Sequence, residues 1–358
     1  MHTDTHLTTI YPPVPVTASG GRTVVRREDA PLGRVLPYHH GQHTTLPTRV
    51  RAEAPGWSVD LGTGGLGDVL LALGAVTAFA DAFPASEPTY RGPRPELFAR
   101  CRLPLRTVPN NGGNTVGAEG PGQYTFDAVP ERPPTWLDLR DDDLVEVHAA
   151  LPMRYYLEVE QRLGRELPRA SAPLPTFTGT GALDPWHVVF IAATSMPGRK
   201  DYGPDGFDEI AQYLADARPG PWRFTLLTGN GASPTQVSTG LDVVAGLDAT
   251  DCLDLFATAA LVIGNDTGLT HLAALTERPD GTSPQVIGLY GRHPYTKWTT
   301  GRSNHHAVAT LFSQMLAHAD RCPVRDQLDD TVWGSASDLR QIPPAEIARF
   351  ALQKLDRR

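Results

Sequence analysis

The chain has 358 residues, of which 40% are hydrophobic and 20% charged, and its formal net charge is -8. This composition is typical of a soluble globular protein that is long enough for two hydrophobic cores. The negative charge argues against nucleic acid or an anionic membrane as a partner, because both attract basic surfaces. The three cysteines are too scattered for a disulfide framework or a structural zinc site, which favours the reducing cytoplasm as the location. No stretch reaches the roughly 18 apolar residues of a membrane helix, so we expect no stable membrane insertion.

The N-terminal half begins with an irregular segment and then takes on the pattern of an α/β domain. Residues 1–55 are rich in Thr, Pro, Arg and His without a sustained period, so they predict an extension. From residue 56 to about 180, short apolar runs alternate with helical patterns. The predicted strands are 57–61, 88–92 and 135–140, and the predicted helices are 68–83, 95–101 and 145–164. Residues 106–134 are rich in Gly, Asn and Pro and predict a mobile loop near a cleft.

A glycine-rich turn separates the first predicted strand from the first predicted helix. Gly62, Gly64 and Gly67 allow a sharp turn and close approach of another group, and Asp68 follows the last of them. The free N–H groups at the start of the helix favour a negative group there. The same spacing fits the dinucleotide-binding fingerprint, with Glu87 as the nearby acidic residue. These residues alone leave both a phosphate site and an NAD(P) site open.

The C-terminal half predicts a second α/β domain. The stretch 167–184 is rich in Pro, Ser, Thr and Gly and is the best candidate for a linker. Beyond it, strands and helices alternate strictly, as parallel sheets require. The predicted strands are 186–193, 222–229, 243–246, 261–265 and 283–291, and the predicted helices are 203–217, 250–260 and 267–276. Residues 343–358 predict an amphipathic helix with prolines in its first turn.

A second turn with the potential to bind a ligand follows the strand 261–265. Asp266 forms the turn, Thr267 and Gly268 open the next helix, and His271 lies on its first turn. Because ligands bind beyond the carboxyl ends of parallel strands, we expect this turn to face a cleft. Its unpaired N–H groups and helix dipole suit a diphosphate, and Thr267 and His271 can add donors.

Both turns belong to segments that resemble a known family. GGLGDVLLALGAVTAFADAFP and DLFATAALVIGNDTGLTHLAAL resemble the two signature regions of glycosyltransferase family 9, the ADP-heptose:lipopolysaccharide heptosyltransferases. HAALPMRYYLEVEQRLG and VIGLYGRHPYTKW resemble further segments of that family, so the resemblance covers about residues 57–300. It implies an α/β fold of the GT-B type, with two Rossmann-like doubly wound domains facing a central cleft. The implied parts are an extension at 1–55, an acceptor domain at 56–180, a donor domain at 181–340 and a helix at 341–358 that packs back on the N-terminal domain.

The resemblance also implies roles for individual residues. Asp68 would be the catalytic base. The residues implied to bind the nucleotide-sugar donor are Thr194, Ser195, Lys200, Asp266, Thr267, Gly268 and His271. Arg199 is adjacent to Lys200 and is an alternative to it. Gly64, Gly65 and Gly67 would leave room for the acceptor.

These roles imply an inverting, metal-independent glycosyltransferase without a cofactor. The base deprotonates an acceptor hydroxyl, and the lysine and helix N–H groups stabilise the departing diphosphate. We expect a heptose-like sugar or another hexose, and a small-molecule, secondary-metabolite or glycolipid acceptor. Two alternatives stay open: an NAD(P)-dependent oxidoreductase that uses the glycines at 62–67, and a non-catalytic module that binds sugar nucleotides. Asp68 and Asp266 also fit plain helix caps, and the pair His305–His306 lacks metal-binding spacing.

Overall fold

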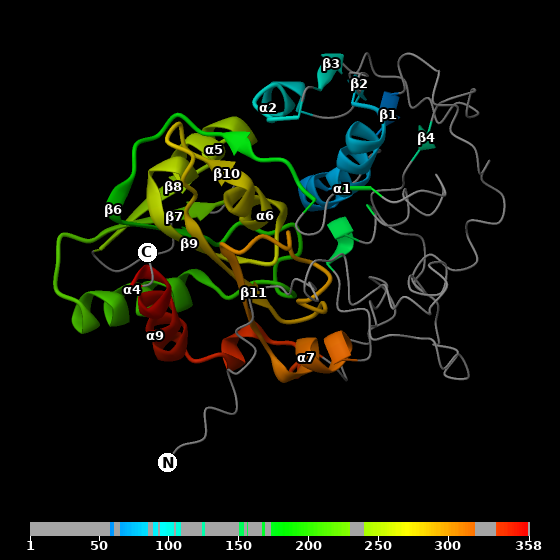
Figure 1. The fold of residues 1–358 in the computed structure, drawn as a ribbon. Helices are drawn as coiled ribbons and strands as arrows, with labels where there is room; N and C mark the ends of the chain where they lie inside the picture. The colour runs from blue at the N-terminus through cyan, green and yellow to red at the C-terminus, as the bar shows by residue number, and fades with distance from the viewer. Residues whose placement is uncertain are drawn as a thin grey trace, which may run out of the picture.

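The computed structural model shows an α/β fold with parallel sheets, as the sequence predicts (Figure 1). The residues it describes are 58–60, 65–84, 89–91, 94–103, 105–108, 124–125, 150–153, 156, 167–168, 173–229, 240–318 and 334–356. The expected extension at 1–55, the predicted strand at 135–140, Gly62, Gly64 and Glu87 lie outside this part of the chain. None of the described helices is long and apolar enough to cross a membrane.

A small parallel sheet forms the N-terminal part of the described chain. Its strand order is β3-β2-β1-β4. The strands are β1 (Ser58–Asp60), β2 (Thr89–Arg91), β3 (Arg106–Val108) and β4 (Tyr124–Thr125). The helices α1 (Leu66–Ala82) and α2 (Pro95–Phe98) accompany this sheet. The segment 106–134, predicted as a loop, therefore contains two short strands, which are too brief to show an apolar alternation in the sequence.

A six-stranded parallel sheet forms the C-terminal part, with strand order β12-β11-β9-β6-β7-β8. Its strands are β6 (Asp184–Ile191), β7 (Arg223–Thr228), β8 (Leu241–Ala245), β9 (Ala259–Asn265), β11 (Gln285–Tyr290) and β12 (His305–Ala309). If the six strands are numbered 1 to 6 along the chain, their order across the sheet, read from β8 to β12, is 3-2-1-4-5-6. This is the doubly wound order of dinucleotide-binding domains. The strand order changes direction between β6 and β9, so the loops after these two strands flank the crevice where such sheets bind ligands.

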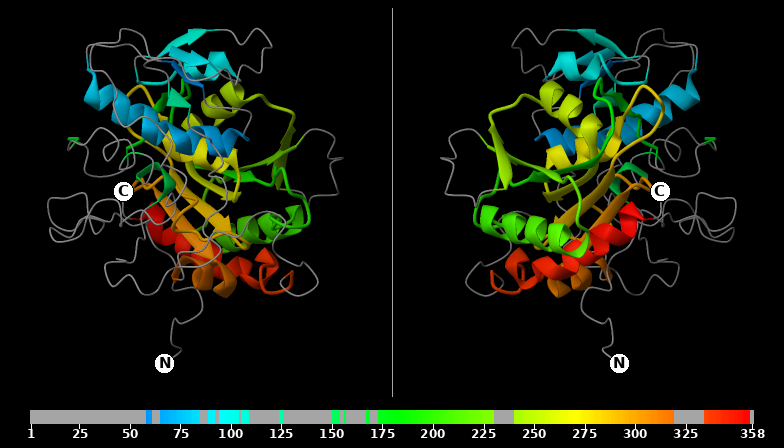
Figure 2. Two further views of the ribbon diagram at one scale, coloured as in Figure 1. Left: turned by 90° about the vertical axis from the view of Figure 1, so that its right-hand side faces the viewer. Right: turned by 90° about the vertical axis from the view of Figure 1, so that its left-hand side faces the viewer.

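Helices cover both faces of the six-stranded sheet (Figures 1 and 2). The helices α4 (Pro204–Ala217) and α9 (Pro344–Leu355) lie on one face, and α5 (Ala249–Thr258) and α6 (Gly268–Leu275) on the other. Strand residues alternate between the two cores: Val188 and Phe190 join one, Val189 and Ile191 the other. The strands are apolar on both faces because both faces are covered.

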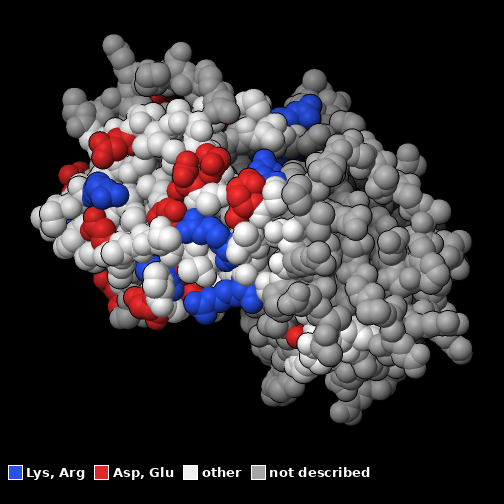
Figure 3. Space-filling model, turned by 90° about the horizontal axis from the view of Figure 1, so that it is seen from above, with Lys and Arg blue, Asp and Glu red and all other residues white. Residues whose placement is uncertain are grey.

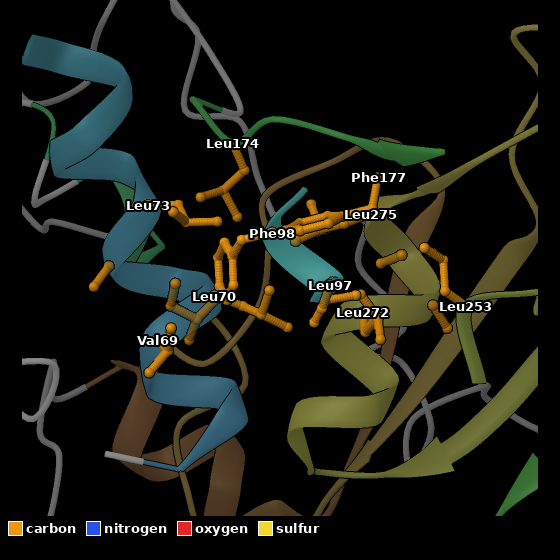
Figure 4. Packing of buried hydrophobic residues seen from close by; sticks show 14 of the residues in the cluster. Val69, Leu70, Leu73, Leu97, Phe98, Leu174, Phe177, Leu253, Leu272 and Leu275 are labelled. Atoms are coloured by element: carbon orange, nitrogen blue, oxygen red, sulfur yellow. The ribbon is translucent and has the colours of Figure 1, made fainter. Parts of the chain in front are cut away.

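The apolar core on the α5–α6 face continues into the N-terminal part, so α1 packs directly on α6. Figure 4 shows Leu70 and Leu73 of α1 and Phe98 of α2 facing Leu272 and Leu275 of α6. Most of α1 is buried, which explains why its sequence is apolar on every side.

The segment 167–184, predicted as a linker, is packed where the structure describes it. Residues 177–178 form strand β5 (Phe177–Thr178), which pairs with β10 (Thr276–Glu277). Phe177 is fully buried and lies edge-on to Phe98, with ring centroids 5.7 Å apart. The apolar residues of the segment 167–184 therefore hold the N-terminal and C-terminal parts together. The Pro and Gly content of this segment is nevertheless typical of an exposed connection.

Ion pairs reinforce the same junction near its surface. Arg100 pairs with Asp254 at 2.6 Å and Arg102 with Glu277 at 2.7 Å. On the face seen in Figure 3, acidic and basic side chains lie interspersed over the described part. Because these pairs are partly exposed, solvent screens them, and the apolar packing below dominates the junction.

The expectation that the C-terminal helix packs on the N-terminal domain is wrong for the described residues. The apolar stripe of α9, with Ile347 and Ala351, joins Ile210 and Leu214 of α4 in the core on the opposite face of the six-stranded sheet. An amphipathic helix packs where an apolar face is uncovered. The helix α4 leaves part of the sheet face at β9 and β11 uncovered, and α9 packs there. The helix thus completes the C-terminal part.

Candidate functional site

The loops after β6 and β9 lie side by side because one buried amide ties them together. Asn265, the last residue of β9, has no exposed surface. Its Nδ2 donates to the carbonyl of Ala192 at 3.1 Å, and its Oδ1 accepts from the N–H of Tyr202 at 3.1 Å. The loop 192–203, which holds Thr194, Ser195 and Lys200, is therefore fixed beside the turn after β9.

Lys200 and Asp266 form a buried ion pair at the centre of this arrangement. Lys200 Nζ lies 2.7 Å from Asp266 Oδ2, and the side chains are 13% and 4% exposed. The neighbouring Arg199 is exposed, so Lys200 is the cation at the turn. Sequence patterns indicate both partners as site residues but do not predict that they pair.

Two histidines complete the surroundings of Asp266. His271 Nε2 lies 4.0 Å from Asp266 Oδ1, and His293 Nδ1 lies 3.6 Å from Oδ2. His293 is a site residue that the sequence analysis missed. The signal was present, because it stands just after β11, the neighbour of β9, at the same carboxyl edge of the sheet.

The charges in this cluster follow from burial and neighbours. Burial raises the pKa of Asp266, but Lys200, His293 and His271 outweigh it, so the net pKa is below its usual value. Burial lowers the pKa of His271 to about 4, against the opposing effect of Asp266. At neutral pH the turn therefore holds one compensated ion pair and an uncharged imidazole.

Two buried polar atoms at the start of α6 lack a partner among the described residues: Thr267 Oγ1 and His271 Nδ1. Thr267 is the N-cap of α6, yet its side chain makes no capping hydrogen bond. Buried polar atoms are rarely left unpaired, and the first N–H groups of a helix also need acceptors. An anionic group bound here would accept from the Thr267 hydroxyl and from the N–H groups.

The first turn of α1 meets the first turn of α6 at a glycine contact. A Cβ on Gly268 would overlap the backbone nitrogen of Gly67, and a Cβ on Gly67 would lie 3.2 Å from Cδ2 of His271. Only glycines permit this approach, which brings the N-termini of the two helices together. Gly67 is thus packed against α6, whereas Gly65 is exposed and Gly64 lies outside the described residues.

Asp68 stands at the third position of α1, next to this contact. It is partly exposed, and its Oδ2 accepts the N–H of Gly65, the N-cap residue, at 3.0 Å. The capping role that the sequence leaves open is thus present in the structure, with Asp68 inside the helix.

Thr194 and Ser195, the other residues that the sequence predicts for the donor site, lie in the loop 192–203 beside the ion pair. Thr194 Oγ1 accepts the N–H of Met196 at 3.1 Å, and Ser195 is exposed in the same loop. His305 and His306 lie on β12 and point apart, with His306 Nε2 2.8 Å from Gln285 Oε1. Within the described ranges, no group of three His, Cys, Asp or Glu is arranged to hold a metal ion.

Buried neutral histidines predict acid sensitivity. Burial lowers the pKa of His187 and of His271 to about 4, and that of His305 well below its usual value. The unfolded chain takes up these protons near pH 6.5, so stability is complete above that pH and falls as the pH drops toward 4. We expect His187 and His271 each to cost about 2 kcal/mol of unfolding free energy at pH 5 relative to pH 7.5, measured by urea unfolding. A flat stability profile from pH 7.5 to 5 would contradict this.

Comparisons with known proteins agree with this fold. The family model described as glycosyltransferase family 9 (heptosyltransferase) matches residues 144–323, which is half of the chain. No curated protein matches the chain by sequence at a significant level.

Several solved structures are similar in fold. Heptosyltransferase WaaC of E. coli with ADP has a TM-score of 0.53 and 16% identity, covering 83% of this chain and 99% of that one. A family 9 glycosyl transferase from Veillonella parvula has a TM-score of 0.57 and 14% identity, covering 87% and 100%. ADP-heptose lps heptosyltransferase II of E. coli has a TM-score of 0.51 and 13% identity, covering 84% and 99%. These structures, which include GT-B heptosyltransferases, share their overall fold with the chain.

Proposed function

Because the chain belongs to glycosyltransferase family 9, and so is a glycosyltransferase, we propose that it transfers a sugar from a nucleoside-diphosphate donor to an acceptor hydroxyl with inversion. One observation carries this proposal. The N-termini of α1 and α6 meet at Gly67 and Gly268, so the start of α1, which holds Asp68, lies next to the turn that holds the Lys200–Asp266 pair. A base and a diphosphate site are the two groups that a direct displacement needs.

The donor diphosphate binds at the start of α6 in this proposal. Thr267 Oγ1 and the free N–H groups of the first turn donate to its oxygens. His271 is neutral with Nε2 toward the Asp266 carboxylate, so its Nδ1 is an acceptor that is open to a hydroxyl of the donor. Lys200 supplies positive charge from the loop after β6, where Thr194 and Ser195 add hydroxyls. An adenine nucleotide is the first candidate, because one similar structure contains ADP. The sugar is a heptose or another hexose.

The transfer proceeds by a single displacement. Asp68 removes the proton of the acceptor hydroxyl, whose oxygen attacks the anomeric carbon while the bond to the diphosphate breaks. Attack from the side opposite the leaving group inverts the configuration. Lys200 and the N-terminus of α6 stabilise the charge that develops on the diphosphate, so the scheme needs no metal.

The acceptor approaches from the side of the glycine turn. Gly65 is exposed beside Asp68, whereas Gly67 supports the contact with α6. The acceptor is a small molecule, a secondary metabolite or a glycolipid. The competing oxidoreductase hypothesis rests on the glycine spacing alone, and membership of a transferase family argues against it.

A nucleotide-binding screen tests the proposal. We expect at least one of ADP, UDP, GDP and dTDP to bind in calorimetric titrations, and NADH not to bind. Thr267→Val keeps the shape of the side chain and removes a hydroxyl that has no partner in the described structure. It should weaken binding about fivefold without lowering the melting temperature, since no intramolecular bond is lost. Binding of NADH alone would defeat the transferase proposal.

A further inference from the structure

His305 is a fully buried histidine on β12 that no predicted role includes. It lies between the loop that follows β11 and the helix α6. We infer that His305 is a positioning residue, which holds His271 and the segment 298–300 in the geometry that binds the donor. This inference rests on the proposed function, because it assigns the support of the same donor site.

Hydrogen bonds fix the protonation state of the His305 ring. The N–H of Thr300 donates to Nδ1 at 3.3 Å, and the hydroxyls of Thr300 and Thr299 lie 3.0 and 3.2 Å from the same atom. A backbone N–H can only donate, so Nδ1 carries a lone pair and the hydrogen resides on Nε2. His305 is therefore a neutral imidazole in a single tautomer.

The hydrogen on Nε2 continues the network into the loop after β11. Nε2 lies 3.3 Å from the hydroxyl oxygen of Tyr290, and that hydroxyl donates to the carbonyl of Trp298 at 2.8 Å. The backbone of residues 298–300 is thus held at two points by one imidazole. The ring of Trp298 in turn lies 5.4 Å from the ring of His293, which faces Asp266.

The backbone leaves space for this arrangement. A Cβ on Gly288 would lie 2.8 Å from Tyr290 Cε2 and 3.1 Å from His305 Nε2. Any larger residue at position 288 would displace the phenol of Tyr290 and the imidazole of His305.

His305 also packs behind a proposed donor residue. Its ring centroid lies 5.8 Å from that of His271. His271 directs Nε2 toward Asp266 and leaves Nδ1 for the donor, an orientation that requires a fixed ring. Burial and the neighbouring histidines His271 and His306 keep the pKa of His305 well below its usual value, with Asp266 opposing. A proton on Nδ1 would break the bond from Thr300.

The chain offers a matched control for the loss of a buried histidine. His187 on β6 is equally buried, and its ring nitrogens lie 2.8 and 2.9 Å from the hydroxyls of Thr258 and Thr225. His187 lies in the first half of β6, away from the carboxyl end of the sheet, where the turn at Asp266 and the proposed donor site lie. Replacing it measures the structural cost of losing such a residue, apart from any effect on the site.

The test compares His305→Gln, His305→Asn and His187→Asn. Glutamine retains a donor near the position of Nε2, and asparagine an acceptor near that of Nδ1. We expect all three to melt at lower temperature, and both His305 variants to bind the nucleoside diphosphate chosen by the wild type about tenfold more weakly. His187→Asn should keep its affinity within about twofold. Folded His305 variants with wild-type affinity would overturn the inference.

Two further measurements keep the outcomes distinct. If the His305 variants do not fold, Tyr290→Phe removes one hydroxyl and should lower nucleotide affinity about threefold; unchanged affinity would then refute the positioning role. Nitrogen NMR of the ligand-free protein should show His305 neutral with its hydrogen on Nε2, and the opposite tautomer would refute the network. A wild-type protein that binds no nucleoside diphosphate would instead overturn the proposed function, and this role with it.

Discussion

Replacing Asp68 with asparagine is expected to lower turnover by roughly 10²- to 10⁴-fold, the usual loss when a general base is removed. The amide cannot accept the proton of the acceptor hydroxyl, so the nucleophile stays protonated. Nucleotide affinity should stay within about twofold, because the diphosphate binds the first turn of α6 in the proposed function. Turnover and calorimetric affinity, measured on the same preparation, separate these two effects.

The asparagine variant also separates catalysis from helix capping. Its amide oxygen still accepts the N–H of Gly65, the bond that Asp68 Oδ2 makes at 3.0 Å, so the helix should remain stable. Asp81→Asn is a matched control on the same helix, where Oδ2 accepts the hydroxyl of Tyr156 at 2.8 Å. Asp81→Asn should retain turnover. Full turnover in Asp68→Asn would reduce Asp68 to a cap.

Replacing Lys200 with methionine is expected to destabilise the fold by about 3 kcal/mol. The change leaves the carboxylate of Asp266, which is 4% exposed, without the lysine that compensates it at 2.7 Å. The pKa of Asp266 then rises, because burial is opposed only by the histidines. Donor affinity should fall as well, since Lys200 is the proposed cation for the diphosphate. Chemical unfolding and nucleotide titration measure the two effects.

Two further variants test the reason for that loss. Lys200→Met combined with Asp266→Asn removes both charges, so stability should recover while donor affinity does not. Arg100→Met is the control for a more exposed pair, because Arg100 and Asp254 are 20% and 37% exposed at 2.6 Å. It should cost less than about 1 kcal/mol. Equal losses for Lys200→Met and Arg100→Met would show that burial of the Lys200 pair is unimportant.

Local patterns in the sequence predict most elements around the site. The predicted strand 57–61 and helix 68–83 correspond to β1 and α1, and the predicted strand 261–265 falls within β9. A buried strand followed by a turn and a helix is recognisable because its residues are adjacent along the chain. For the same reason, local pattern alone is enough to indicate the turn at Asp266 and the place of Asp68 at the start of a helix.

The residues missed by the sequence analysis depend on long-range contacts. His293 stands in an irregular loop, and only the pairing of β11 with β9 brings it within 3.6 Å of Asp266. Both adjacent histidines of β12 are buried, and no local pattern separates the one that supports the site from the one that packs under α9. Their different roles follow from the faces that β11 and α9 cover.

The sequence by itself determined the α/β alternation, the family and the two turns that end in helices, because each depends on residues a few positions apart. Only the tertiary structure decided that Lys200 rather than Arg199 meets Asp266, that Gly67 packs on Gly268, and that the C-terminal helix covers the six-stranded sheet. These contacts join residues far apart along the chain. The position of the C-terminal helix depends on which apolar faces remain uncovered once the sheet has formed. The local pattern of apolar residues in the sequence does not show this.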